Sequence, residues 1–369
     1  MNFIISLFNL FKILNNDKID YLFYSEGKVY QNNFYNFIVK LNEKSKTKIY
    51  YVSSEINDKI NLEGVINIYI GKGLARLFFF NYIKCKFFFI TLTDMGNYYL
   101  KKSNKVYKYV YIFHSPISLN RSYTPKAFNN YDIFFSIGKK HSEELIKIFQ
   151  NNKLKNKKIE NIGYFYFDFL TKQINLQKFE KNTILIAPSW NYNPKNFLNT
   201  SCIELIKCLL NKGFKVIFRP HPQHYKKNKI TLQQIRKYFI ENTNFLFDSN
   251  FSNIRSIQKS EILITDNSGI AIEFCLIAKR PIFYFDSSLK LHNRNYYEIS
   301  DIAIEDIIKK KFGKIIGNLD LVKIREVIEE QRNYFNQELS KEIDDFVNSN
   351  YFNYSKSVDK AVNYIIDVN

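Results

Sequence analysis

Two histidines that follow apolar segments are the residues best suited to chemistry. His114 comes directly after the apolar run 107–113, and His221 lies in Arg219-Pro220-His221-Pro222 at the end of the apolar run 215–219. A neutral imidazole, with an ordinary pKa of about 6.5, can accept a proton from an attacking hydroxyl, and a second one beside an arginine can donate to a phosphate. The pair therefore predicts group transfer from a diphosphate-linked donor. For each histidine alone, a structural hydrogen-bonding role at a strand end is the alternative.

The stretch 259–286 holds the second group of candidates. Its sequence predicts a strand, a turn at Asp266-Asn267-Ser268-Gly269, a helix and another strand, an order that implies parallel pairing. The turn would then lie at the carboxyl edge of a sheet, where the backbone N–H groups of a helix start bind anions. With Arg219 and His221, the amides of Ser268 and Gly269 are expected to stabilise the charge of the leaving nucleotide without a metal, since no motif resembles a DxD-type metal site. Glu273 is expected to accept hydrogen bonds from ribose hydroxyls, and a solvated helix face is its alternative.

The first half of the chain alternates strand and helix signals, which is typical of a parallel α/β sheet. His114 would follow one of the strands, and Ser25, Gly71, Asp94 and Gly138 mark turns after others. The expected strands are 19–24, 48–52, 65–70, 87–92, 107–113, 132–136 and 159–164, and the expected helices are 31–42, 74–80 and one that begins after Gly138.

The second half repeats this alternation after a polar, basic stretch, 168–182, which we interpret as a linker. Residues 291–318 are expected to be loop and helix, 319–350 mostly helix, and 355–368 a final amphipathic helix. The other expected strands are 183–187, 215–219, 245–248, 261–265 and 282–285, and the other expected helices are 202–210, 232–242 and 254–260.

These elements predict two facing Rossmann-like α/β domains with a cleft between them. The predicted boundaries are residues 1–172 for an acceptor domain, 173–350 for a nucleotide-donor domain, and 351–369 for a closing helix that packs back toward the first domain. Because ligands bind beyond the carboxyl ends of parallel strands, the strand-end residues of both halves should meet in the cleft.

Composition narrows the class of partner. The formal net charge of the 369 residues is +19, which suits nucleic acid, an anionic membrane surface or an anionic substrate. The basic residues are spread along the chain and no nucleic-acid-binding motif occurs, so a membrane or a phosphate-rich partner is favoured over nucleic acid. The four cysteines form no CxxC pair and are expected to be buried free thiols in a reducing compartment.

The N-terminal stretch MNFIISLFNLFKILNN has two open interpretations. It is too short to span a bilayer, and it lacks the basic region and the cleavage site of a signal peptide. It could be an amphipathic surface anchor, or a first helix packed on the domain. The anchor would use one apolar face, made of Phe3, Ile4, Leu7, Phe8, Phe11 and Leu14.

In combination, these motifs resemble the CDP-glycerol glycerophosphotransferase family of teichoic-acid and capsule polymer enzymes. The family pattern has RxHP, then TDYSS followed by an acidic residue, then KPI and an aromatic strand. Here these correspond to Arg219-Pro220-His221-Pro222, to residues 265–269 with Glu273, and to residues 280–284. Upstream, ILIAPSW at 184–190 resembles a strand ending in APTW, and Phe113-His114-Ser115 with Tyr131-Asp132 resembles WHG and a following YD.

The resemblance implies a GT-B fold and a role for each matching residue. His114 would be the catalytic base, and Ser115, Asp94 and Arg121 are expected on the acceptor side. The donor would be held by Arg219, His221, Ser189, Asp266, Asn267, Ser268, Gly269 and Glu273. Ser115 stands where the family pattern has Gly, Asn191 where it has Arg, and Asn267 and Gly269 where it has Tyr and Ser.

We therefore expect a transferase, without metal or other cofactor, at the cytoplasmic face of the cell membrane. It would move glycerol phosphate, or a related polyol phosphate or sugar, from a CDP-type donor to a hydroxyl of a polyprenyl- or glycan-linked polymer precursor. One alternative is a GT-B glycosyltransferase or epimerase that uses another nucleotide sugar. The other is a non-catalytic basic scaffold that binds anionic polymer or membrane.

Overall fold

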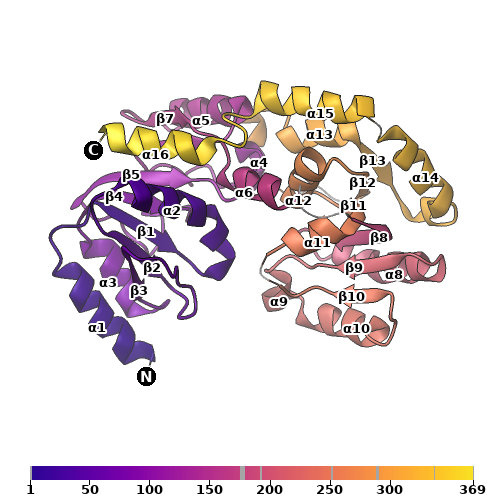
Figure 1. The fold of residues 1–369 in the computed structure, drawn as a ribbon, viewed down its shortest axis with the longest axis horizontal. Coiled ribbons are helices and arrows are strands. Elements are labelled where there is room, and N and C mark those ends of the chain that lie inside the picture. The colour runs from indigo at the N-terminus through magenta and orange to yellow at the C-terminus, as the bar shows by residue number, and fades with distance from the viewer. Residues whose placement is uncertain are drawn as a thin grey trace.

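Two all-parallel sheets organise the chain into two domains that lie side by side (Figure 1). The computed structural model describes residues 2–174, 179–191, 193–250, 252–287, 291–335 and 337–368. The first sheet has seven strands in the order β3-β2-β1-β4-β5-β6-β7, and the second has six in the order β10-β9-β8-β11-β12-β13. In both sheets the strand order reverses beside a central strand, β1 or β8, which creates a crevice at the carboxyl edge.

The first domain contains all of the strands expected for it. Its strands are β1 (Tyr21–Ser25), β2 (Ile49–Ser53), β3 (Val65–Tyr69), β4 (Cys85–Ile90), β5 (Val106–Ile112), β6 (Ile133–Ser136) and β7 (Lys158–Asn161). Its helices are α1 (Asn2–Leu14), the short η1 (Lys28–Asn33), α2 (Tyr35–Lys44), α3 (Leu74–Tyr82), α4 (Leu119–Ser122), α5 (Lys139–Asn151) and α6 (Phe165–Ile174). The single helix predicted over 31–42 is wrong, because η1 is a 3-10 turn and a break at Phe34 separates it from α2.

The second domain adds a strand that the sequence did not indicate. Its strands are β8 (Glu180–Ala187), β9 (Lys215–Phe218), β10 (Phe245–Phe247), β11 (Ser260–Thr265), β12 (Ile282–Phe285) and β13 (Gly313–Ile316). Its helical segments are α7 (Phe197–Thr200), α8 (Cys202–Asn211), α9 (His224–Lys227), α10 (Lys229–Phe239), α11 (Ile254–Lys259), α12 (Gly269–Glu273), η2 (Phe274–Ala278), η3 (Tyr296–Glu298), α13 (Ile304–Phe312), η4 (Asn318–Leu321), α14 (Ile324–Tyr334) and α15 (Gln337–Asn350). β13 is a short edge strand with Ile315 58% exposed, so its apolar pattern is weak.

Aromatic side chains fill the first core. The central strands β1 and β4 are buried along almost their whole length, as expected of strands covered by helices on both faces. Phe23 of β1 stacks on Phe89 of β4 with ring centroids 4.5 Å apart, and Phe37 of α2 packs edge-on against both rings. Many of the 35 phenylalanines and 27 tyrosines of the chain therefore serve packing.

The polar linker predicted over 168–182 is wrong in its first part. Residues up to Ile174 form α6, whose Phe167, Leu170 and Ile174 are buried, and β8 already begins at Glu180. Asp168 looked polar and exposed in sequence but is buried, where its carboxylate accepts a hydrogen bond from the Val358 amide at 3.0 Å. Sequence periodicity fails here because α6 packs between the domains and buries more than one face.

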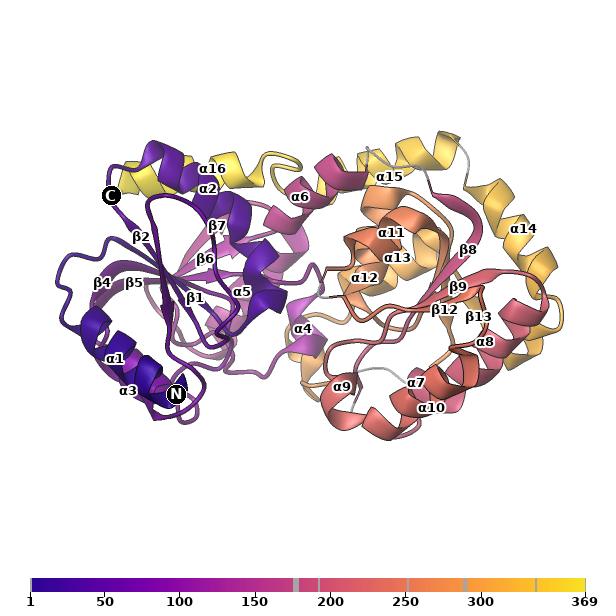
Figure 2. The same ribbon diagram turned by 60° about the horizontal axis from the view of Figure 1, so that its bottom comes forward.

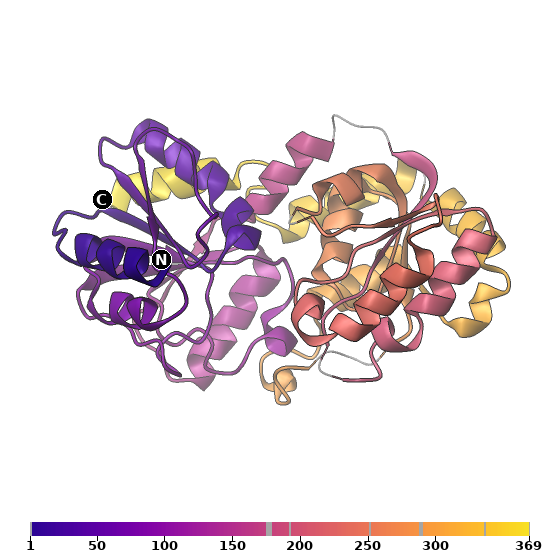
Figure 3. The ribbon, with the colours of Figure 1, turned by 90° about the horizontal axis from the view of Figure 1, so that it is seen from below.

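The C-terminal segment returns to the first domain (Figures 1 and 3). After α15, Tyr351 forms an antiparallel bridge with Gly138, and α16 (Ser357–Val368) packs on α2, with an ion pair between Asp359 and Lys40. Gly163 has a φ of +103°, and a side chain there would overlap the Phe352 carbonyl. Glycine is therefore required at position 163, where the returning C-terminal segment passes close to the main chain.

A loop of the first domain that includes Ser118 is hydrogen-bonded to the second domain, and we call this contact the clasp. Figure 2 shows α4 between the two sheets. The Ser118 hydroxyl accepts a hydrogen bond from the Ile304 amide at 2.6 Å, and Glu305 accepts one from the Ser118 amide at 2.9 Å. This reciprocal arrangement resembles a capping box made between domains, and it fixes the start of α13 against the loop that follows His114.

Candidate active site

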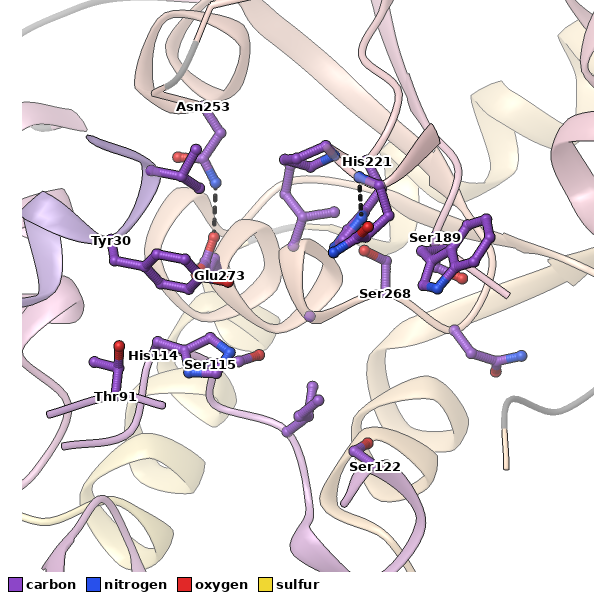
Figure 4. A pocket seen from close by; sticks show the side chains of 18 of the residues that line it. Tyr30, Thr91, His114, Ser115, Ser122, Ser189, His221, Asn253, Ser268 and Glu273 are labelled. Atoms are coloured by element: carbon purple, nitrogen blue, oxygen red, sulfur yellow. Dashed lines mark hydrogen bonds between the residues drawn. The ribbon is translucent and has the colours of Figure 1, made fainter. Parts of the chain in front are cut away.

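A cleft of about 580 Å³ lies between the domains at the carboxyl ends of their strands. This volume lies in the range of small-molecule sites. Figure 4 shows side chains from both domains around it. The lining residues from the first domain include Glu26, Tyr30, Thr91, Asp94, His114, Ser115, Arg121, Tyr164 and Tyr166. Those from the second domain include Ser189, Trp190, Arg219, His221, Asn253, Asn267, Ser268, Gly269, Glu273, His292 and Glu305. Most residues singled out in the sequence therefore meet here.

His114 lies in the wall formed by the first domain, two residues after β5. The Tyr30 ring stands perpendicular to the imidazole, with centroids 5.4 Å apart, and the Tyr164 hydroxyl lies 3.0 Å from the His114 carbonyl oxygen. Ring and backbone are thus both held by neighbouring aromatic residues. This placement suits a base whose position relative to a bound hydroxyl must be fixed.

Glu273 belongs to a polar network that joins the domains. Its carboxylate accepts a hydrogen bond from the Asn253 side-chain amide at 2.8 Å, and its other oxygen lies 3.4 Å from the Tyr164 hydroxyl. Tyr166 in turn donates to the Asn253 oxygen. The network therefore runs from the second domain to the tyrosines of the first domain, and through Tyr164 to the backbone of His114.

The alternative of a solvated helix face for Glu273 is wrong. The residue is only 7% exposed. Burial raises the pKa of the carboxyl group to about 7, against the opposing effects of Asn253, Tyr164 and the charge of Arg219. Glu273 thus titrates near neutral pH at the edge of the cleft, a property typical of functional sites.

Arg219 pairs with a residue that the sequence analysis did not select. Its guanidinium lies 2.7 Å from the Asp248 carboxylate, and the side chains are 13% and 3% exposed. Burial alone would raise the pKa of Asp248, but hydrogen bonds from Ser256 and Asn250 and the Arg219 charge lower it overall. Asp248 is therefore a buried carboxylate that holds Arg219 at the rim of the cleft.

The two histidines of the second domain have different environments. His221 lines the cleft, and its Nδ1 accepts a hydrogen bond from the Gln223 amide at 3.2 Å, so the neutral ring carries its proton on Nε2. His224 is fully buried and binds the Ser189 carbonyl and the Asn228 side chain, each at 3.0 Å. Burial lowers the pKa of His224, which therefore serves as a structural residue beneath the site.

Ser189 and Asp266 bind each other. The Asp266 carboxylate accepts from both the amide and the hydroxyl of Ser189, each at 2.7 Å, and Asp266 is 2% exposed. Asp266 does not line the cleft, whereas Ser189 does. The structure thus places Asp266 as a residue that fixes the loop after β8 against the loop after β11.

The turn Asn267-Ser268-Gly269 opens directly into the cleft. Ser268 is the N-cap of α12, yet its side chain makes no capping hydrogen bond. An N-cap serine ordinarily bonds to an amide of the first helical turn, so the Ser268 hydroxyl differs from that pattern. Together with the following backbone amides, it gives this wall of the cleft several hydrogen-bond donors.

The residues expected on the acceptor side have different surroundings. Asp94 lines the cleft with a φ of +60° and accepts a hydrogen bond from Thr124. Arg121 pairs with Asp306 at 2.6 Å and lies over the Tyr296 ring, so it is engaged in the clasp between the domains. Ser115 lies against Gly269 of the second domain.

Several residues of the site were missed from sequence. They are Tyr30, Tyr164, Tyr166, Asn253 and Asp248. One signal was available for Asp248, because it ends the strand after β9 and could be expected beside Arg219. No comparable signal existed for the tyrosines, which come from η1 and from the segment at the start of α6, and which face the second domain only because of how the domains dock.

His141 of α5 and the four cysteines have structural surroundings. His141 is 2% exposed and contacts the Ile117 carbonyl at 2.6 Å, and burial lowers its pKa to about 4. Three of the cysteines are buried and Cys208 is partly buried, all as free thiols. Among the described residues, no three His, Cys, Asp or Glu side chains gather as they do in a metal site.

The chain matches a family of known proteins over nearly its whole length. Residues 5–366 match the family described as CDP-Glycerol:Poly(glycerophosphate) glycerophosphotransferase. The chain belongs to this family. The resemblance drawn from the Arg-Pro-His-Pro and Thr-Asp-Asn-Ser-Gly motifs is thereby confirmed, and it extends over both domains, including the first hundred residues that carried no recognisable motif.

A curated relative lies within the teichoic-acid enzymes. Teichoic acid glycerol-phosphate primase of Bacillus subtilis (strain 168) is 26% identical over 180 residues, which are 46% of this chain and 43% of that protein. The match thus spans less than half of the relative's length.

Solved structures confirm the predicted fold class of two facing Rossmann-like domains. The wall teichoic acid polymerase TagF has a TM-score of 0.63 at 15% identity, over 98% of this chain and 93% of that chain. The UDP-GlcNAc 2-epimerase from Neisseria meningitidis, bound to UDP-GlcNAc, has a TM-score of 0.59 at 12% identity, over 95% of this chain and 100% of that chain. Because both activities occur on one fold, the fold alone does not choose between them.

Within the described parts of the chain, no helix combines the length and the apolar character needed to cross a bilayer.

Proposed function

We propose that this family member transfers glycerol phosphate, or a related polyol phosphate, from a CDP-activated donor to a hydroxyl of a cell-surface polymer precursor. One observation carries the proposal. His114 and the donor-binding candidates Arg219, His221 and Ser268 line opposite walls of a single cleft. Such a cleft can bind a nucleotide diphosphate on one side and an acceptor hydroxyl on the other.

The proposed step is a displacement at phosphorus. The acceptor oxygen attacks the donor phosphorus that carries glycerol, and His114 takes the hydroxyl proton. A bond forms between the acceptor oxygen and phosphorus, and the bond from phosphorus to the bridging oxygen breaks. CMP leaves with that oxygen and its electron pair. Arg219 and the Nε2–H of His221 stabilise the charge that develops on the leaving phosphate.

The donor lies on the second domain in this proposal. Ser268 and the amides of residues 268 and 269 bind the diphosphate, while Glu273 accepts hydrogen bonds from the ribose hydroxyls. Glu273 lines the cleft, and hydrogen bonds from Asn253 and Tyr164 hold its carboxylate in place, which supports this role. The reaction is proposed to proceed without a metal or other cofactor, and it should therefore persist in EDTA.

The acceptor is proposed to be polyprenyl- or glycan-linked and to approach along the first domain at the cytoplasmic membrane face. α1 packs on this domain through Ser6, Leu10 and Ile13. Its other face is solvent-exposed and apolar, with Ile4, Phe8 and Phe11 each 70% exposed. The exposed Leu74, Phe78 and Tyr82 of α3 extend the same surface. An apolar helix face on a chain with a net charge of +19 suits an anionic bilayer.

The test is release of CMP and extension of the acceptor when the protein is incubated with CDP-glycerol and a primer in vesicles. His114→Ala should reduce transfer by at least a thousandfold while CDP still raises the Tm of the variant. UDP-GlcNAc, the ligand of the epimerase structure, provides the comparison donor. Interconversion of a free UDP-sugar without acceptor would establish the epimerase alternative instead. Binding of anionic polymer with no response to any nucleotide would establish the scaffold alternative, and full activity of His114→Ala would exclude His114 as the base.

A further inference from the structure

The two domains come close to each other inside the cleft at Gly269. A Cβ atom on this residue would lie 2.8 Å from the Ser115 hydroxyl and 3.3 Å from a methyl group of Ile117. The backbone of Gly269 does not have a positive φ, so its conformation alone would accept another residue. A side chain at position 269 would therefore require the Ser115 hydroxyl of the other domain to move.

Serine hydroxyl groups line this part of the cleft from both domains. Ser115 and Ser268 both line the cleft, and the N-cap hydroxyl of Ser268 makes no bond to its own helix. Within the described part of the chain, the Ser115 hydroxyl also has no hydrogen-bond partner. Hydroxyl groups that line a cleft without a bond to another protein group are suited to a bound polar ligand.

We propose that Ser115 is a ligand of the phosphoryl group being transferred, and that the donor site is completed by this residue of the first domain. The inference rests on the transfer reaction proposed above. Ser115 donates a hydrogen bond to a non-bridging oxygen of the phosphoryl group, whose diphosphate lies on Ser268 and the adjoining amides. This moves Ser115 from the acceptor side, where the sequence placed it, to the donor.

Because Ser115 directly follows His114, its contact with the phosphoryl group would affect the geometry of the reaction. The base and the phosphoryl ligand are consecutive residues in one loop, which the Ser118–Glu305 clasp holds against the second domain. Binding of the phosphoryl oxygen by Ser115 therefore sets the distance between the reacting phosphorus and the proton acceptor. Such positioning acts on the rate of the chemical step more than on nucleotide affinity.

Ser115 and Gly269 are two of the positions at which this sequence departs from the motifs that it resembles, and the structure brings them into contact.

The experiment compares Ser115→Gly, Ser115→Ala, Gly269→Ser and the double variant Ser115→Gly/Gly269→Ser. The rate of CMP release from CDP-glycerol and the Kd of CMP are measured for each, with Tm as the check on folding. Ser115→Ala and Ser115→Gly should lower kcat at least tenfold and change the Kd of CMP less than threefold, since CMP lacks the phosphoryl group that Ser115 is proposed to bind. Gly269→Ser should lower kcat because its side chain displaces Ser115. Ser45→Ala, at the end of α2, is the matched control.

The double variant decides the proposal. It should recover kcat to within about threefold of the wild type, because it restores one hydroxyl and removes the overlap. Wild-type kcat in Ser115→Ala, or a double variant whose loss equals the product of the two single losses, would overturn the role of Ser115 alone. Absence of turnover in the wild-type protein with CDP-glycerol would instead refute the proposed function, and this inference with it.

Discussion

The hydroxyl of Tyr164 lies between the main chain of His114 and the side chain of Glu273, 3.0 Å from the carbonyl oxygen of the first and 3.4 Å from a carboxylate oxygen of the second. It therefore connects the expected base in one domain with the expected ribose ligand in the other. Burial raises the pKa of Tyr164 well above its ordinary value, so the hydroxyl stays protonated as a donor.

Tyr164→Phe should lower kcat about tenfold with little loss of stability, because the ring remains packed edge-on against Phe167. Loss of the donor to Glu273 should also raise the pKa of that carboxyl group further. The measurement is the pH profile of CDP affinity, whose midpoint should move upward. Tyr334→Phe is the control, since Tyr334 also donates to a carbonyl but lies on the exposed surface. An unshifted midpoint would contradict the link.

Glu273 should make both stability and donor binding depend on pH. Its folded pKa is raised from 4.5 to about 7, so between these values the folded protein binds more protons at this group than the unfolded chain. The free energy of unfolding should therefore fall by about 3 kcal/mol as pH rises through this window. Urea unfolding of the wild type and Glu273→Gln at pH 5 and pH 8 checks this, because the difference between the two proteins isolates the residue.

The same titration should act on the donor in the opposite direction. An ionised carboxylate is the better acceptor for ribose hydroxyls, so the Kd of CDP should decrease as pH rises from 6 to 8. In Glu273→Gln the Kd should be higher and independent of pH in this range. Equal pH dependence in the two proteins would assign the effect to another group.

Substitutions in the Arg219–Asp248 pair should distinguish its effect on stability from its effect on donor binding. Arg219→Ala leaves Asp248 as a buried carboxylate without its cation, and should cost about 3 kcal/mol of unfolding free energy. Arg219→Ala/Asp248→Asn should recover much of this stability because the unpaired charge is removed. If Arg219 also contacts the diphosphate, CDP affinity should stay low in the double variant; recovery of affinity together with stability would show a structural role only.

The exposed face of α1 should govern contact with lipid. Phe8→Asp/Phe11→Asp replaces two residues that are each 70% exposed, so the fold should tolerate it. Binding to anionic vesicles, measured by co-sedimentation, should fall more than tenfold, since each buried phenylalanine contributes about 2 kcal/mol. Leu319→Asp is the control, because Leu319 is 91% exposed but lies on the second domain. Equal binding by the α1 variant would disprove the anchor.

Sequence patterns predicted the fold well where local chemistry is decisive. Apolar runs bounded by turn residues located the central strands, because such strands are buried on both faces and end at polar loops. The edge strand β13 was not predicted because only one of its four residues is buried. Helix α6 was not predicted because its polar residue Asp168 is buried and accepts a hydrogen bond from a residue 190 positions away.

The strand-end residues of the site could be predicted from sequence, whereas the contacts between the domains could not. His114, His221 and Ser268 could be placed in one cleft because they follow parallel strands, and these ends share an edge. The burial of Glu273 could not be predicted, because Tyr164 and Asn253 reach it from two different domains. The pairing of Ser115 with Gly269 likewise depends on how closely the domains approach, which no local pattern records.

The return of α16 to the first domain has a consequence for synthesis on the ribosome. Val358, Ala361, Val362 and Ile365 belong to the same buried cluster as Phe23 and Phe37. The first domain emerges first but cannot complete this cluster until residues 357–368 have been translated, whereas the second domain is continuous in sequence. We therefore expect the second domain to reach its native state earlier, while the nascent first domain exposes apolar surface that a chaperone can recognise.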